Sequence, residues 1–181
     1  IIMMQVENET GSYGSPLDVS AQANRLFAQP PPAELARKIG KSGTWTQAFG
    51  WKADQAFNSW YTARYVDQVA AAGQAELNLP MYANAALSSP FDEKGAIYNA
   101  SGGPNWNVVD IWKVAAPHIA LVAPDIYDRD YAVNAKQLEN YARPDNTLLC
   151  PRTAMPPNIR ASCGSRSARA RSAGRRSEWT R

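Results

Sequence analysis

The sequence opens with Ile-Ile-Met-Met-Gln-Val-Glu-Asn-Glu-Thr-Gly-Ser-Tyr-Gly at residues 1–14, and the interpretation of the whole chain starts from this stretch. Residues 1–6 are a short, nearly continuous apolar run, which predicts a buried β-strand. The run ends in two carboxylates, Glu7 and Glu9, and Gly11 and Gly14 then interrupt regular structure. A carboxylate at the end of a buried strand is costly to desolvate, so its presence needs a reason. One such reason is a raised pKa, which lets the group donate a proton near neutral pH.

Beyond this stretch, apolar runs alternate with helical patterns. Further strands are predicted over residues 77–82, 119–124 and 146–150. Helices are predicted over residues 33–39, 53–72, 108–115 and 130–142, with Gly40 and Gly73 as stop signals and Asp130 as a cap. Regular alternation of strands and helices predicts an α/β fold with a parallel sheet and right-handed crossovers.

Residues 5–14, Gln-Val-Glu-Asn-Glu-Thr-Gly-Ser-Tyr-Gly, resemble the acid/base segment of the β-galactosidases of glycoside hydrolase family 35. These retaining glycosidases are built on a (β/α)8 barrel, and the resemblance spans roughly residues 1–151. It implies that the four predicted strands are barrel strands four to seven, about half of a barrel. A chain of 181 residues is too short for a complete barrel, which needs about 200 residues or more. Without the resemblance, part of an open doubly wound sheet fits the alternation almost equally well.

The resemblance also implies roles for individual residues. Asn8 corresponds to the sugar-binding amide and Glu9 to the general acid/base, in a periplasmic or secreted enzyme that hydrolyses terminal β-galactosides with retention. Asn84 and Tyr127 follow or end the next predicted strands and are candidate substrate-binding residues, although a tyrosine at the rim with a solvated hydroxyl is an alternative. Asp125 is a second carboxylate near the same rim, where we expect it to support the site. A surface turn after a core strand is the alternative for the Glu9 segment itself.

The expected nucleophile is absent from the sequence. A retaining glycosidase needs two carboxyl groups about 5–5.5 Å apart, one to protonate the leaving oxygen and one to attack the anomeric carbon. In the branch of the family that the chain resembles, strand seven ends in Pro-Glu-Thr-Gly, whereas this chain has Pro151-Arg152-Thr153-Ala154. Arginine stays protonated and is no nucleophile. At such a distance it favours the ionised form of Glu9. We therefore expect no galactosidase turnover by this chain.

The end of the chain differs in composition from the rest. Residues 1–150 have 11 Lys and Arg against 15 Asp and Glu, a net charge of −4, whereas residues 151–181 have eight Arg and one acid, a net charge of +7. We divide the chain into a partial barrel domain over 1–151 and an unrelated basic tail over 152–181, which is disordered or arises from a frameshift near residues 150–152. A basic arm for nucleic acid is the competing hypothesis. Arginine without lysine, and Trp179 as the sole aromatic, make a poor stacking surface, so we expect no nucleic-acid partner.

Several other classes of protein are disfavoured. The chain has no apolar run long enough to span a membrane. Cys150 and Cys163 make neither a disulfide framework nor a metal site, and we expect no metal or other cofactor. His118 precedes a strand at the end opposite the candidate site and is interpreted as structural, as is Glu7. The alternatives to a β-galactosidase are another β-glycosidase of the same clan or a non-catalytic carbohydrate-binding remnant. The oligomeric state stays open.

Overall fold

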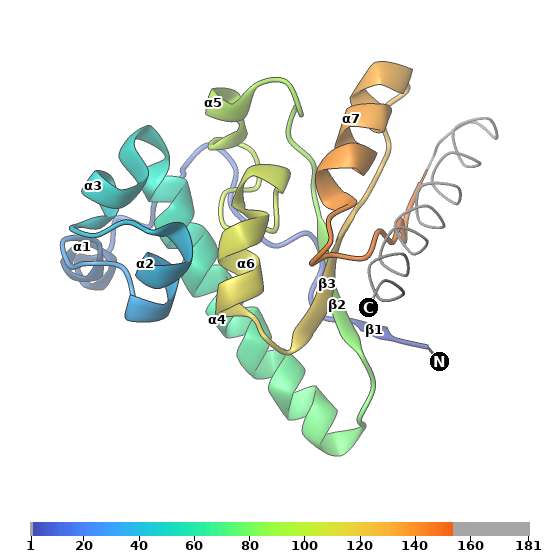
Figure 1. The fold of residues 1–181 in the computed structure, drawn as a ribbon, viewed down its shortest axis with the longest axis horizontal. Helices are drawn as coiled ribbons and strands as arrows, with labels where there is room; N and C mark the ends of the chain where they lie inside the picture. The colour runs from blue at the N-terminus through green and yellow to red at the C-terminus, as the bar shows by residue number, and fades with distance from the viewer. Residues whose placement is uncertain (1, 154–181) are drawn as a thin grey trace, which may run out of the picture.

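The structure is a computed structural model that describes residues 2–153, and it has a mixed α/β fold (Figure 1). The strands are β1 (Met4–Gln5), β2 (Met81–Ala85) and β3 (Ile119–Pro124). The helices are α1 (Ala21–Phe27), α2 (Ala33–Ile39), α3 (Trp45–Phe49), α4 (Ala53–Glu76), α5 (Glu93–Ala96), α6 (Val109–Ala115) and α7 (Tyr131–Tyr141), with short 3₁₀ turns at Gly50–Lys52 and Trp106–Val108. Of the tail predicted over residues 152–181, the structure describes Arg152 and Thr153, and residues 154–181 lie outside the described part of the chain.

The three strands form one parallel sheet in the order β1-β2-β3. Met4 pairs with Met81, and Met81 pairs in turn with Ile119, so the strands start together and their carboxyl ends meet at one edge. The described residues therefore form a small open sheet with helical crossovers, as the alternation predicted. They do not close into a barrel.

The first strand is shorter and more exposed than predicted. Regular pairing is confined to Met4–Gln5, Ile2 is 91% exposed, and Val6 is the first buried residue. The prediction of a buried strand over residues 1–6 was wrong because β1 lies at the edge of the described sheet, where it pairs with β2 on one side only. The second strand begins at Met81 rather than at residue 77, since Pro80 cannot donate to the ladder from within a strand.

Helix α4 is the longest element and packs beside α6 (Figure 1). Its buried face includes Phe57, Trp60 and Val66, whereas Tyr65 is exposed. The helix also continues through Gly73, which the sequence predicted as its end. A Cβ atom at Gly73 would lie 3.0 Å from the side chain of Met81, so glycine here allows the first residue of β2 to pack against the helix.

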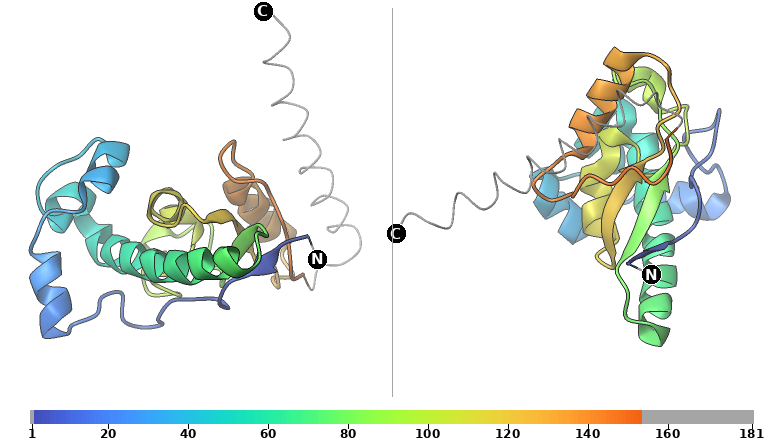
Figure 2. Two further views of the ribbon diagram at one scale, coloured as in Figure 1. Left: turned by 90° about the horizontal axis from the view of Figure 1, so that it is seen from below. Right: turned by 90° about the vertical axis from the view of Figure 1, so that its right-hand side faces the viewer.

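The connection between β1 and α4 contains α1 and α3 in addition to the predicted helix over residues 33–39. Figure 2 shows α1, α2 and α3 at one end of α4, away from the sheet. Helix α2 begins directly after Pro32, and Gly40 ends it, as predicted, in the left-handed conformation at φ 65°. Trp45 is buried and packs edge-on against Phe57 with ring centroids 5.3 Å apart. Trp45 thus anchors this segment to the core.

The predicted strand over residues 146–150 is not formed in the described part of the chain. Instead, the buried side chain of Asn146 occupies the outer edge of β3. Its Oδ1 accepts from the Val122 N–H at 2.8 Å, and its Nδ2 donates to the carbonyls of Val122 and Tyr141, both at 2.9 Å. One amide side chain therefore makes the hydrogen bonds that a neighbouring strand would make. Pairing resumes further on, where Ile126 and Thr153 form a parallel bridge.

Helix α6 packs against α4 and α2, and α7 packs beside β3. Helix α6 buries Val109, Ile111 and Trp112, close to the predicted boundaries. Helix α7 begins at the predicted cap, where the Asp130 carboxylate accepts from the N–H groups of Ala132 and Val133. Among the described residues, none of the helices is both long and apolar enough to cross a bilayer.

Candidate functional site

The candidate site lies at the carboxyl edge of the sheet, where all three strands end. Asn8 and Glu9 follow β1, Asn84 lies near the end of β2, and Asp125 comes directly after β3. Because the strands are parallel, these side chains meet although Asn8 and Asp125 are 117 positions apart in the sequence. Glu7 and Glu9 both have positive φ angles, 59° and 48°. Residues other than glycine adopt this backbone conformation at a cost in free energy. The turn after β1 is therefore strained where the carboxylates leave the strand.

Asn84 links the three strand ends. It is 1% exposed, and its Oδ1 accepts a hydrogen bond from the Glu9 N–H at 3.0 Å. Its Nδ2 donates to Asp125 Oδ2 at 2.6 Å and to Asn8 Oδ1 at 3.2 Å. A single buried amide thus fixes the strained backbone at Glu9 and orients the side chains on either side of it.

The pKa of Glu9 is raised above its usual range. Burial is the largest cause, followed by a side-chain hydrogen bond and charge repulsion involving Asp125, and the charge of Arg152 opposes the shift. Two carboxyl groups in contact share a proton more readily than two solvated ones do, because one charge disfavours the other. A half-buried carboxyl that keeps its proton to higher pH has the property required of a general acid.

Arg152 lies on the same side of the sheet as the carboxylates. Its guanidinium Nη1 is 3.7 Å from Asp125 Oδ2, and its carbonyl accepts from the Ile126 N–H at 3.0 Å. As expected, the charge of Arg152 by itself lowers the pKa of Glu9 and favours the ionised carboxylate. The expectation was wrong for the pKa as a whole, which is raised because burial and Asp125 outweigh the arginine. The sequence did not indicate that an ion pair with Asp125 would occupy the guanidinium.

Asp125 does not take the place of the missing nucleophile. Its side chain has no exposed surface and is held by Asn84 and Arg152. A carboxylate that a substrate cannot reach cannot attack an anomeric carbon. Its place supports the expected role of polar support for Glu9.

The other candidate residues lie apart from this cluster. Tyr127 is 54% exposed at the rim, and Glu7 is exposed and accepts from the hydroxyl of Tyr65 at 3.3 Å. His118 lies at the start of β3, where its N–H and ring Nδ1 contact the buried carboxylate of Asp67 at 2.8 and 3.0 Å. The interpretation of His118 as structural fits that position.

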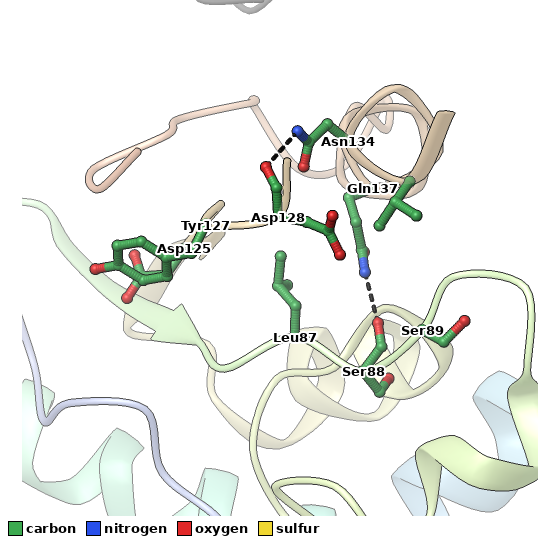
Figure 3. A pocket seen from close by; sticks show the side chains of 9 residues that line it. Leu87, Ser88, Ser89, Asp125, Tyr127, Asp128, Asn134 and Gln137 are labelled. Carbon is green, nitrogen blue, oxygen red and sulfur yellow. Dashed lines mark hydrogen bonds between the residues drawn. The ribbon is translucent and has the colours of Figure 1, made fainter. Parts of the chain in front are cut away.

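A cleft of about 470 Å³ adjoins the cluster and shares Asp125 with it (Figure 3). It is lined by residues after β2, after β3 and on the first turns of α7: Leu87, Ser88, Ser89, Asp125, Tyr127, Asp128, Val133, Asn134 and Gln137. The sequence analysis missed Asn134 and Gln137. Their spacing of three residues on a helix was the available signal, since it places two amides on one face.

Among residues 2–153, no group of three or more His, Cys, Asp and Glu side chains is placed to hold a metal ion. In comparison with known proteins, the chain matches no family model and no curated protein sequence. The site is therefore interpreted from its own geometry and from the resemblance of residues 5–14.

Proposed function

We propose that this chain carries the acid/base half of a β-galactosidase site, built on part of a (β/α)8 barrel, and that it binds terminal β-galactosides without hydrolysing them. Glu9 is the proton donor in this proposal. Asn8, Asn84 and Tyr127 are the groups proposed to bind the sugar. The family, the substrate and a secreted or periplasmic location all rest on the resemblance of residues 5–14.

The single observation that supports the proposal best is the environment of Glu9. The carboxyl is half-buried at the carboxyl edge of a parallel sheet, where α/β enzymes place their sites. Its pKa is raised by burial and by Asp125, as an acid catalyst requires. An exposed surface turn, the alternative for this segment, would give neither property.

The absence of turnover follows from the residues that face Glu9. Arg152 stands where the resemblance places the nucleophile, and Asp125 is buried and held by Asn84. Without an accessible second carboxylate, no glycosyl-enzyme ester forms. The chain is in this proposal a non-catalytic carbohydrate-binding remnant, and a remnant of a β-glycosidase for another sugar is the alternative that the same geometry permits.

The proposal is tested by measuring binding and turnover on the purified 181-residue chain. We expect saturable binding of methyl β-galactoside by calorimetry and no release of nitrophenol from 4-nitrophenyl β-galactoside. Methyl α-galactoside and methyl β-glucoside are the matched ligand controls. Tighter binding of the glucoside would favour the β-glycosidase of different specificity, and no saturable binding of any glycoside would refute the proposal.

Turnover would contradict the prediction of inactivity. If nitrophenol is released, the same assay on Glu9→Gln decides whether this site is responsible, because glutamine keeps the size of the side chain and cannot donate a proton from a carboxyl. The variant Glu7→Gln, altered at an exposed carboxylate two residues away, is the control.

A further inference from the structure

One side of helix α4 is exposed but carries no charged residue. Between residues 61 and 75 the exposed positions recur every three or four residues, so they lie on one side of the helix. They are Tyr61, Tyr65, Gln68, Val69, Ala72 and Ala75. A helix side that faces water normally carries charges, and an exposed side without them is typical of a surface that another protein surface covers.

The edge of the sheet at β1 is unpaired. The Met4 N–H donates to the Pro80 carbonyl at 2.9 Å and so points toward β2. Because this direction alternates along a strand, the N–H groups of Met3 and Gln5 point to the outer side, where no strand of residues 2–153 pairs with β1. The opposite edge of the sheet is different, since the side chain of Asn146 occupies it. The open edge can therefore accept a further strand.

The side chains of β1 on the helical face of the sheet are exposed as well. Met4 pairs with Met81, so the two point to the same face, and Met81 packs there against Gly73 of α4. Met81 is 3% exposed, whereas Met4 is 41% and Ile2, on the same face, is 91% exposed. Helix α4 thus covers β2 and leaves the apolar side chains of β1 open to a second helix or strand.

The open edge and the uncharged helix side form one continuous face. The hydroxyl of Tyr65 donates to Glu7 Oε1 at 3.3 Å, which joins the exposed side of α4 to the turn that follows β1. Figure 2 shows β1 running alongside α4. A partner that fills this face needs a strand edge beside an uncharged helix, and the chain itself presents that combination.

We propose that this face, formed by the outer edge of β1 and the uncharged side of α4, binds a second copy of the chain. A two-fold axis perpendicular to the sheet makes the two β1 strands antiparallel neighbours and joins both three-stranded sheets into one. The same axis keeps the helices of both copies on one face of the joined sheet. Helix α4 of each copy therefore packs beside α4 of the other, over the exposed side chains of β1.

The charge of the face favours a second copy over a different partner. In a two-fold contact a surface meets itself, so a surface with charges of one sign repels its copy. The six exposed positions of α4 carry no charge, and such a contact forms without repulsion there. A charged partner would find no complementary charge on the same positions. This proposal is independent of the sugar chemistry of the candidate site.

The first test measures the mass of the purified 181-residue chain by light scattering without any ligand. We expect the mass to rise from 19.8 kDa toward twice that value over a range of about 2–200 μM, since specific interfaces reach at least micromolar affinity. Tyr65→Lys places a charge on the face of each copy and should raise the dissociation constant about tenfold or more. Tyr131→Lys is the matched control, because Tyr131 is equally exposed, on α7 beside the opposite edge of the sheet, and should change nothing.

The second test follows hydrogen exchange of single amides by NMR on the unaltered chain. Exchange at Gln5 should slow as the concentration rises, because its outward N–H is paired only between two copies. Exchange at Met4 should stay slow throughout, since its N–H already donates to Pro80. This comparison decides the question even where Tyr65→Lys fails to fold.

The two tests have distinct negative results. A mass of one chain at every concentration would overturn the second copy as the occupant of the face. A dimer in which Gln5 exchanges at an unchanged rate, and which Tyr65→Lys leaves intact, would place the interface elsewhere and overturn the proposed face. Both measurements are made without a sugar, so neither result bears on the proposed function.

Discussion

Replacing Asn84 by alanine tests whether one amide holds the candidate site together. In the structure this side chain accepts from the Glu9 N–H and donates to the buried carboxylate of Asp125. A hydrogen bond to a charged group contributes about 1.5–3 kcal/mol, and a neutral one about 1 kcal/mol. The bond to Asn8 is exposed at one end and adds less. We therefore expect Asn84→Ala to lower the free energy of unfolding by about 3 kcal/mol at pH 7.

The measurement is urea unfolding at pH 7, followed by tryptophan fluorescence, with thermal unfolding as a second method. For a chain of this size, 3 kcal/mol corresponds to a fall in Tm of about 6–12 °C. The matched control is Asn8→Ala, which removes an exposed amide from the same cluster and is expected to cost less than about 1 kcal/mol. Equal, small effects of the two variants would refute the conclusion that Asn84 links the strand ends.

Three further predictions concern the ionisation of the site and the edge of the sheet. Because the pKa of Glu9 is raised in the folded chain, its ionisation opposes folding as the pH rises from its ordinary value of 4.5 through the raised one. The Tm of Glu9→Gln relative to the unaltered chain should therefore increase between pH 4 and pH 7, and a constant difference would contradict the shift. Arg152→Ala removes the charge that opposes this shift, so the pKa of Glu9 measured by ¹³C NMR titration of its carboxyl signal should be higher than in the unaltered chain. A lower pKa in the variant would contradict the conclusion that Arg152 acts on Glu9. Asn146→Ala removes three buried hydrogen bonds and should lower the free energy of unfolding by about 3 kcal/mol. Hydrogen exchange at the Val122 amide should become faster in this variant. Unchanged exchange there would show that the Asn146 side chain does not protect the edge of β3.

The sequence by itself determined the elements whose signals are local. The apolar run of β3, the cap at Asp130 and the left-handed Gly40 were predicted at the positions where the structure has them. These features depend on neighbouring residues in the chain, and each has its own steric or hydrogen-bonding cause. The candidate residues Asn8, Glu9 and Asn84 were likewise found from the sequence, through the resemblance of one short segment and the rule that polar groups gather where parallel strands end.

Tertiary structure decided the features that depend on contacts between distant segments. Gly73 lies inside α4, where the side chain of Met81 packs against it, and the amide of Asn146 bonds to the edge of β3 in place of a strand. The pKa of Glu9 is raised and not lowered because burial and Asp125 together outweigh Arg152, a balance set by where three chain segments meet. The positions of two amide side chains in the cleft have the same origin, since Ser88 and Asp128 fix the nitrogens of Gln137 and Asn134. Burial and hydrogen-bond geometry belong to the folded chain as a whole, and a pattern of neighbouring residues does not contain them.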